Sequence, residues 1–508
     1  MIKVRNIKSK SFTNIMMVFA LLLLAPSCDD RWAEMNTDPN QIVDLPDGYL
    51  FNSAVRGTFL DALSRIQADF GGQYAHMVTS DVFNREIDKY NDIHSQGDVQ
   101  EDIFRSVYNG AVRNIREVLT LTKEGKYKND VRHAQATVID VVNIAKVTDL
   151  FGDVPFVQAA QGKSGTYTPA YDAQKDIYSG MIAMLTESLT ILNNATPNQS
   201  YPQKFDPLFY GDLSAWKRFT NSMKLRLAMR ARFKDPATYN PIIAECLTAP
   251  LIETNESNAK LETWDNANPT LYNPWYNKII DYNANRFTIL WSDMFISTLQ
   301  TSNDPRLSFF ATKNKNGVYL GMPNGLLDIP YSQWSKVNTS RFTDEFVARD
   351  QPLYLMTASE IWLLRAEAAL FSIGQPADAN TLYQTGIRMA MEQWNIPAGQ
   401  ISQYLSTEPT ATLAGSMDNQ LNQISTQLWI AFAPNFAESW HTIKRTGYPI
   451  IPQRTDPNYS KGVTDGFLPR RLKYPFTVEK ITNGANIQIA IDRMGGTDKI
   501  DTPVWWDN

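Results

Sequence analysis

Two stretches of the chain combine aromatic rings with amide and charged side chains. The first spans residues 71–90 and contains Tyr74, His76, Phe83, Asn84, Arg85 and Tyr90. The second spans residues 266–287 and contains Tyr272, Trp275, Tyr276, Tyr282, Asn285 and Arg286. Sugars present flat apolar faces and rings of hydroxyl groups, so a sugar site needs aromatic platforms beside hydrogen-bonding groups. These residues are therefore the candidate ligand contacts.

The same two stretches would also suit a peptide ligand. Backbone amides of a peptide would pair with Asn and Gln side chains, and its charged terminus would pair with Arg85 or Arg286. The sequence does not separate an oligosaccharide from an oligopeptide. Aromatic residues in loop-rich regions are also common in protein cores, so a purely structural role is the alternative for each of them.

Catalytic and metal chemistry have no sequence signature here. The chain has no GxSxG, HExxH or phosphate-loop motif, and its 4 histidines (residues 76, 94, 133 and 441) form no HxxxH pair. Paired carboxylates like those of a glycoside hydrolase would occur by chance among 53 acidic residues. Their presence therefore does not distinguish a hydrolase from a binding protein. We predict a binding protein without catalytic residues, metal or cofactor. A surface glycoside hydrolase and a purely structural or adhesive protein are the alternatives.

The N-terminus has the pattern of an export signal. Lys3, Arg5, Lys8 and Lys10 precede an apolar run from residue 15 to residue 25, which is shorter than the roughly 20 residues of a membrane-spanning helix. The sequence predicts a signal peptide over residues 1–27. The stretch that ends in Cys28 is similar to a bacterial lipoprotein signal, although Ala25 stands where leucine is usual. We therefore predict that Cys28 is lipidated, with a plain cleavable signal as the alternative.

Charge and cysteine content limit the partners and the covalent structure. The formal net charge is −5 and becomes more negative when the basic signal is removed, so nucleic acid is not an expected partner. Only Cys246 remains if Cys28 carries lipid, which leaves no intramolecular disulfide. The remaining chain is long enough for one large or two intimate domains.

Apolar residues recur at helical spacing through most of the chain and predict paired helices. The expected pairs lie at 103–119 with 131–148, 171–192 with 212–232, and 357–374 with 378–394; a fourth pair is less clear, and residues 420–449 are its strong member. They form a helical scaffold over about 98–248 and 352–450. Paired helices with small residues at their crossing points suggest tetratricopeptide-like repeats, but their spacing is too uneven to establish a repeat array. Residues of about 250–350 are rich in Asn, Trp, Tyr and Pro and predict an irregular lobe. Residues 471–491 are expected to be partly extended.

Several local signals predict where elements begin and end. Thr357 and Glu360 match a capping box, and Pro434 predicts a break in the last helical segment. Gly152 and Gly447 are expected to end helices, and Lys444 and Arg445 would then lie at a negative helix end. In "NDPRL", Arg306 is expected to reach back to a carboxylate.

Eight ordered motifs carry a family resemblance that covers nearly all of residues 28–508. They are "MNTDPN" (35–40), "DLFGDVPFVQAAQG" (149–162), "DLSAWKRFTNSMKLRLAMR" (212–230), "NDPRL" (303–307), "PLYLMTASEIWLLRAEAAL" (352–370), "ESWHTIKRTGYPII" (438–451), "RRLKYP" (470–475) and "GGTDKIDTPVWWD" (495–507). In order and spacing they resemble the SusD/RagB family of Bacteroidetes outer-membrane lipoproteins, in particular its SusD-like branch.

The resemblance implies a mainly α-helical fold, with four tetratricopeptide-like helix pairs and an irregular ligand-facing lobe in a single domain over residues 28–508. It also implies a lipid-anchored protein at the surface of the outer membrane. Family members capture oligomeric nutrients and deliver them to SusC-like TonB-dependent transporters. We therefore expect such a transporter and an oligosaccharide or oligopeptide as partners.

Overall fold

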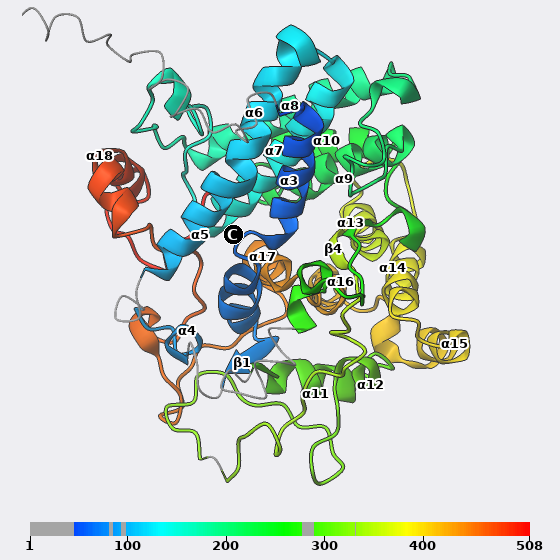
Figure 1. Cartoon of the computed structure of the whole chain (residues 1–508). Helices are drawn as coiled ribbons and strands as arrows, with labels where there is room; N and C mark the ends of the chain where they lie inside the picture. The colour runs from blue at the N-terminus through cyan, green and yellow to red at the C-terminus, as the bar shows by residue number, and fades with distance from the viewer. Residues whose placement is uncertain (1–44, 81–84, 93–97, 277–288, 331, 508) are drawn as a thin grey trace, which may run out of the picture. The chain divides into compact units, whose positions relative to one another are not determined.

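The computed structural model describes residues 45–80, 85–92, 98–276, 289–330 and 332–507, and within them the chain is mainly helical (Figure 1). The helices are α3 (Asp47–Leu60), α4 (Arg85–Asp88), α5 (Val99–Val107), α6 (Arg113–Lys123), α7 (Asp130–Phe151), α8 (Gln174–Asn193), α9 (Leu213–Ala231), α10 (Pro236–Cys246), α11 (Asp293–Thr301), α12 (Leu307–Phe310), α13 (Ala358–Leu370), α14 (Ala379–Gln393), α15 (Ala398–Thr407), α16 (Met417–Ala431), α17 (Phe436–Thr446) and α18 (Val478–Arg493). Residues Asp47–Asn508 form one compact unit.

Helix α7 lies in the middle of the N-terminal half of the scaffold. The Asn129 side chain caps its start by accepting a hydrogen bond from the Arg132 backbone N–H at 3.0 Å. Gly152, with φ of 91°, ends it, as the sequence predicts. Most α7 side chains are buried because α3, α6, α8 and α9 all pack against it. A helix surrounded in this way needs apolar residues on more than one face.

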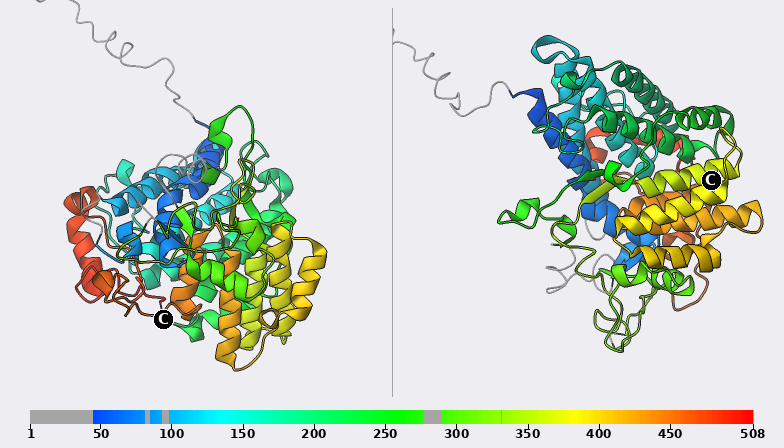
Figure 2. Two further views of the ribbon diagram at one scale, coloured as in Figure 1. Left: turned by 90° about the horizontal axis from the view of Figure 1, so that it is seen from below. Right: turned by 90° about the vertical axis from the view of Figure 1, so that its right-hand side faces the viewer.

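The four predicted helix pairs are present in the structure. They are α6 with α7, α8 with α9, α13 with α14, and α16 with α17. Figure 2 shows α13 and α14 (yellow) beside α16 and α17 (orange), and α13 packs directly on α16. Before the first pair, α5 and α6 form one continuous helical run through a π-helical turn, η3 (Tyr108–Val112).

Predicted helix boundaries are confirmed where the signal is local. Helix α16 ends at Ala431 and α17 begins at Phe436, so the helical segment is interrupted around Pro434. Gly447 follows α17 with φ of 79°. The Thr357 hydroxyl accepts a hydrogen bond from the Glu360 backbone N–H at 3.3 Å, which is one half of the predicted capping box. The Glu360 carboxylate instead pairs with Arg226 of α9.

The lobe between residues 250 and 350 contains short strands and turns. Strand β1 (Val78–Ser80) pairs antiparallel with β3 (Ile289–Trp291), and β2 (Ala259–Leu261) pairs antiparallel with β4 (Leu353–Met356). Both pairings bring this lobe against segments that are distant in the chain. Arg306 donates to Asp304 at 2.9 Å, and both side chains are fully buried, so the predicted reach to a carboxylate is confirmed.

The expectation of extended backbone near the C-terminus is wrong for residues 478–491. They form helix α18, which continues to Arg493. Apolar and polar residues alternate irregularly there, and the helix is held by tertiary hydrogen bonds, including one from the Asn483 amide to the Pro169 carbonyl at 2.9 Å. Such contacts override a weak local preference.

Candidate functional site

Three residues of the second aromatic stretch and its surroundings form a half-buried cluster, here called the Arg349 clamp: Tyr272, Tyr276 and Arg349. The Arg349 guanidinium carbon lies 4.7 Å from the centre of the Tyr272 ring and 4.4 Å from that of Tyr276. Its Nη2 donates to the Tyr276 hydroxyl at 2.9 Å. The two rings meet edge to face with centroids 6.3 Å apart. This arrangement combines cation–π contacts with an aromatic pair.

The clamp is mounted on a loop with several backbone anchors. Asn273 is the main one: its backbone N–H donates to the Arg349 carbonyl at 2.7 Å, and its side-chain amide donates to the Gln351 carbonyl at 2.7 Å. The Tyr272 hydroxyl donates to the Asn266 carbonyl at 2.8 Å. Trp275 is buried against Phe436 of α17, with ring centres 5.9 Å apart. The loop is therefore fixed to the helical scaffold.

Solvent reaches the clamp and its neighbours. The Arg349 side chain is 36% exposed, the Asp265 side chain is 57% exposed, and Trp264 is 41% exposed. Asp265 Oδ1 lies 3.2 Å from Arg349 Nη1, and this hydrogen bond, with that to Tyr276, raises the pKa of Arg349. The site therefore offers apolar ring faces, a fixed positive charge, and hydroxyl and carboxylate groups, which are the groups that recognise a sugar ring and its hydroxyls.

The first aromatic stretch lies mostly inside the protein. Tyr74 is 2% exposed and packs against Trp440, and Tyr90 is fully buried under the Arg454 guanidinium, 3.6 Å from its ring centre. His76 Nε2 lies 2.7 Å from the Tyr90 hydroxyl. Burial accordingly lowers the pKa of His76 well below its ordinary value. Tyr74 and Tyr90 thus have no surface for a ligand, and this cluster supports the fold.

The remaining predicted contacts divide into two groups. Arg85 is part-buried, and its guanidinium donates to the carbonyl oxygens of Leu326 and Leu327 at 2.8 and 3.3 Å, so it holds a loop. The other predicted residues lie outside the described part of the chain: Cys28, Phe83, Asn84, Tyr282, Asn285 and Arg286.

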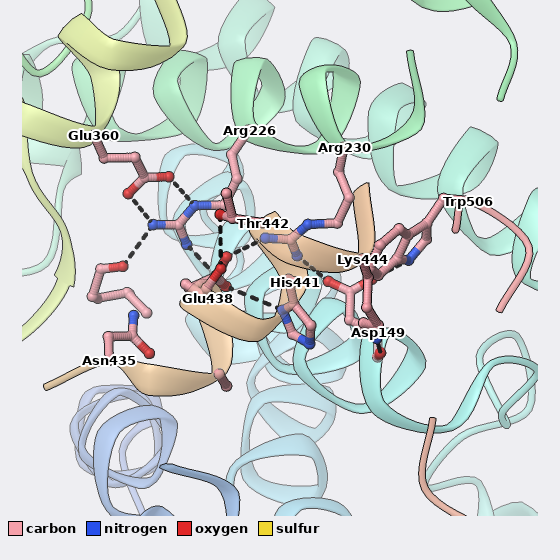
Figure 3. Close-up of polar contacts among 12 residues, drawn as sticks. Asp149, Arg226, Arg230, Glu360, Asn435, Glu438, His441, Thr442, Lys444 and Trp506 are labelled. Carbon is pink, nitrogen blue, oxygen red and sulfur yellow. Dashed lines mark hydrogen bonds and ion pairs between the residues drawn. The ribbon is translucent and has the colours of Figure 1, made fainter. Parts of the chain in front are cut away.

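A buried network of charged side chains connects four helices and was not predicted (Figure 3). Arg226 of α9 donates twice to Glu360 of α13, both at 2.5 Å. Arg230, one turn later, donates to Asp149 of α7 and to Glu438 of α17. Each of these three carboxylates is therefore held by a guanidinium. Such an arrangement fixes the helices relative to one another, because breaking one partner leaves a buried charge.

Electrostatics keep the network in a defined charge state. Burial raises the pKa of Glu438, but the positive charges of Arg230 and Arg226 outweigh it and hold this pKa well below the ordinary value. His441 and Lys444, on the same helix, are buried without a strong carboxylate partner. Burial lowers their pKa values to about 4 and about 7, respectively.

One residue of this network, Arg230, could be recognised from the sequence pattern. Arg230 lies on the same helical stripe as Trp216, Phe219, Met223 and Leu227, so its charge falls on an apolar face. A charge in that position indicates a buried partner. Lys444 and Arg445 lie in the last turn of α17, as predicted. Both are also buried: Lys444 Nζ donates to the Asp149 carbonyl at 3.0 Å, and Arg445 pairs with Glu367.

Two general features of the described residues bear on function. They contain no group of three or more His, Cys, Asp or Glu side chains arranged to hold a metal ion. Among the same residues, no helix combines the length and the apolar character needed to cross a membrane.

Comparison with known proteins assigns the chain to a family. A family model described as "Starch-binding associating with outer membrane", SusD-like, matches residues 39–475. No curated protein sequence matches the chain. A solved structure named a chitin-binding protein is 26% identical, with a TM-score of 0.78, over 91% of this chain and 100% of its own.

Two further solved structures have the same fold. A chitin-binding SusD homolog from Flavobacterium johnsoniae is 23% identical with a TM-score of 0.79, over 91% of this chain and 98% of its own. A SusD homolog from Bacteroides uniformis is 25% identical with a TM-score of 0.77, over 91% and 99%. Because the family model covers most of the sequence and the structures agree over nearly the whole chain, the protein belongs to the SusD-like family.

Proposed function

We propose that the protein is a cell-surface lipoprotein that binds oligosaccharides at the Arg349 clamp and delivers them to a SusC-like TonB-dependent transporter in the outer membrane. In this proposal Cys28 carries the lipid anchor after removal of residues 1–27, and residues 28–508 form a single SusD-like domain. The observation that carries the ligand assignment is the clamp itself: two half-exposed tyrosine rings stacked on one guanidinium.

Family membership supports binding of a carbohydrate, since the matching model is described as starch-binding and a 26% identical structure is named a chitin-binding protein. The clamp supplies the physical basis, because ring faces pack on the apolar faces of sugars while Arg349 and Asp265 are placed to bond hydroxyls. Binding without cleavage is proposed, because the matching family model is described as starch-binding and similar solved structures are named chitin-binding.

Calorimetric titration with oligomers of N-acetylglucosamine and of glucose tests the assignment. We expect wild-type protein to bind one of them and the Tyr272→Ala/Tyr276→Ala variant to bind it at least about tenfold more weakly, since each ring contributes of the order of 1 kcal/mol. Tyr49→Ala is the matched control, because Tyr49 is 55% exposed and is not part of the clamp.

The outcomes separate the possible functions. Unchanged affinity of the double variant would remove the clamp as the glycan site. Binding of a mixed oligopeptide library, lost in the same variant, would replace the oligosaccharide by an oligopeptide. Chromatography of the recovered glycan should show the input length, and shortened products would show an enzyme.

A further inference from the structure

A large groove lies on the α5–α6 side of the scaffold and shares no lining residue with the Arg349 clamp. It has a volume of about 940 Å³ and runs between the α5–α6 helical run and the loop of residues 155–169, beside the start of α18. This volume is in the range of sites for drug-sized ligands and short oligomers. The groove, here called the basic groove, is lined on its helical side by Arg105, Tyr108, Asn109, Arg113, Thr120 and Lys123.

The basic groove has three exposed positive charges on its helical side. Arg105, Arg113 and Lys123 are exposed, and none of them forms an ion pair within the part of the chain that the structure describes. At 1.5 Å per residue, Arg105 and Arg113 are about 12 Å apart along the helical run, and Arg113 and Lys123 about 15 Å. The three cations are thus spread along the groove and suit an extended anion with several charges.

The other charged groups of the groove are already satisfied within the protein. Lys163 pairs with Glu117 at 2.8 Å, and Arg116 pairs with Asp140 at 2.8 Å. The Glu101 carboxylate accepts from the Glu479 backbone N–H at 3.0 Å. The Glu479 carboxylate in turn accepts a hydrogen bond of 3.0 Å from the Tyr171 hydroxyl. The Glu101 and Glu479 carboxylates keep their negative charge when they accept these hydrogen bonds, and Glu101 interacts electrostatically with Arg105. Outside the two ion pairs, the lining therefore has three cations and two carboxylates.

Neutral groups between the cations have the chemistry of hydroxyl recognition. Asn109, Thr120, Gln161 and Ser164 are exposed lining residues with amide or hydroxyl groups. Tyr108 is fixed on the groove wall by a tilted ring contact with Phe104, with ring centres 4.6 Å apart, and by a hydrogen bond of 2.7 Å from its hydroxyl to the Pro155 carbonyl. No strand lines the groove in the described residues, so β-addition of an extended peptide has no template there.

We propose that the basic groove is a second binding site, which takes an acidic oligosaccharide whose carboxylate groups pair with Arg105, Arg113 and Lys123. This inference rests on the proposed function as a glycan-binding protein. It adds a second binding site and the class of ligand that this site takes. The clamp has one guanidinium and a neighbouring carboxylate, whereas the basic groove has three cations that form no ion pair among the described residues, beside the carboxylates of Glu101 and Glu479. The two sites therefore select neutral and acidic glycans separately.

The test uses a hexamer of galacturonic acid, its fully methyl-esterified form and hexaglutamate as probes for the full chain in calorimetric titration. We expect the acid hexamer to bind, the neutral ester to bind at least about tenfold more weakly, and Arg105→Gln/Arg113→Gln to weaken binding of the acid form by a similar factor or more. The matched control is Arg341→Gln/Arg388→Gln, which removes two exposed arginines outside the groove.

Each contrary result identifies which proposal fails. Equal binding of the acid and the ester, or no binding of either, would overturn the groove assignment. So would a loss of acid-hexamer binding in Tyr272→Ala/Tyr276→Ala but not in Arg105→Gln/Arg113→Gln. Tighter binding of hexaglutamate would replace the saccharide by an acidic peptide. Binding at the clamp is measured separately, with neutral glycans, so these results do not decide whether the clamp proposal is correct.

Discussion

Acidification should destabilise the protein through His441. This side chain is 3% exposed and lies between Trp440 and Trp506, with ring centres 5.8 Å away in each case. Its Nδ1 is 3.9 Å from Glu438, and neither ring nitrogen has a hydrogen-bond partner among the described residues. Burial, together with the positive charge of Lys444, lowers its pKa from 6.5 to about 4.

The magnitude follows from proton linkage. Between pH 6.5 and pH 4 the unfolded chain binds a proton at His441 that the folded protein does not bind, so stability falls as the pH is lowered through this range. At 1.36 kcal/mol per pKa unit, the full effect is roughly 3 kcal/mol. Above pH 6.5 both states are neutral at this position, and the free energy of unfolding is unaffected.

Urea unfolding followed by tryptophan fluorescence at pH 7.5, 5.5 and 4.0 measures the effect. His441→Leu removes the titrating ring, so the wild type should lose roughly 3 kcal/mol more stability than this variant between pH 7.5 and 4.0. His133→Gln is the comparison: burial also lowers the pKa of His133, but this side chain is only half-buried, so its removal should flatten the pH profile less than His441→Leu does. Parallel pH profiles for the wild type and His441→Leu would refute a buried neutral His441.

Three further predictions concern the ion pairs, the clamp loop and the anchor. Glu367 accepts from Arg445 at 2.6 and 2.7 Å and from Arg232 at 2.9 Å, so Glu367→Gln should lower the free energy of unfolding by about 3–5 kcal/mol in urea titrations. Glu253→Gln, at an exposed pair with Arg365, should change it by less than about 1 kcal/mol, and equal effects would contradict the argument. Trp275→Ala should cost about 3–5 kcal/mol because the ring is buried, whereas Tyr272→Ala should leave the thermal midpoint nearly unchanged; a similar loss in both would show that the clamp tyrosines are part of the core. Cys28→Ala should move the protein from the membrane to the soluble fraction with an unchanged circular dichroism spectrum, and persistent membrane association would exclude the lipid anchor.

The sequence predicted those features whose causes lie within a few residues. The apolar periodicity of residues 131–148 corresponds to α7, and the Thr357 cap, the break at Pro434 and the turn at Gly447 lie where expected. Each depends on a local rule of backbone geometry or hydrogen bonding. Local rules therefore gave most of the helical scaffold.

Features that depend on distant partners were missed. Arg226 and Glu360 are 134 residues apart in the chain, and Arg230 and Glu438 are 208 apart, so their pairing requires knowledge of the tertiary arrangement. Composition likewise did not distinguish Tyr90, which is buried under Arg454, from Tyr276, which is half-exposed beside Arg349. Both tyrosines have a nearby arginine, and only the surrounding packing decides which ring reaches solvent.

The ion network and the clamp share one structural support. Phe436, the first residue of α17, packs under Trp275 of the clamp loop, and Glu438, two residues later, is held by Arg230 of α9. The first turn of α17 thus connects the base of the exposed loop to the buried charges of α9 and α7. A loop carries a precise site only when its anchors are rigid. The buried network therefore helps to fix the position of the loop that carries Tyr272 and Tyr276, and in the proposed function it supports ligand binding although none of its charged groups belongs to the clamp.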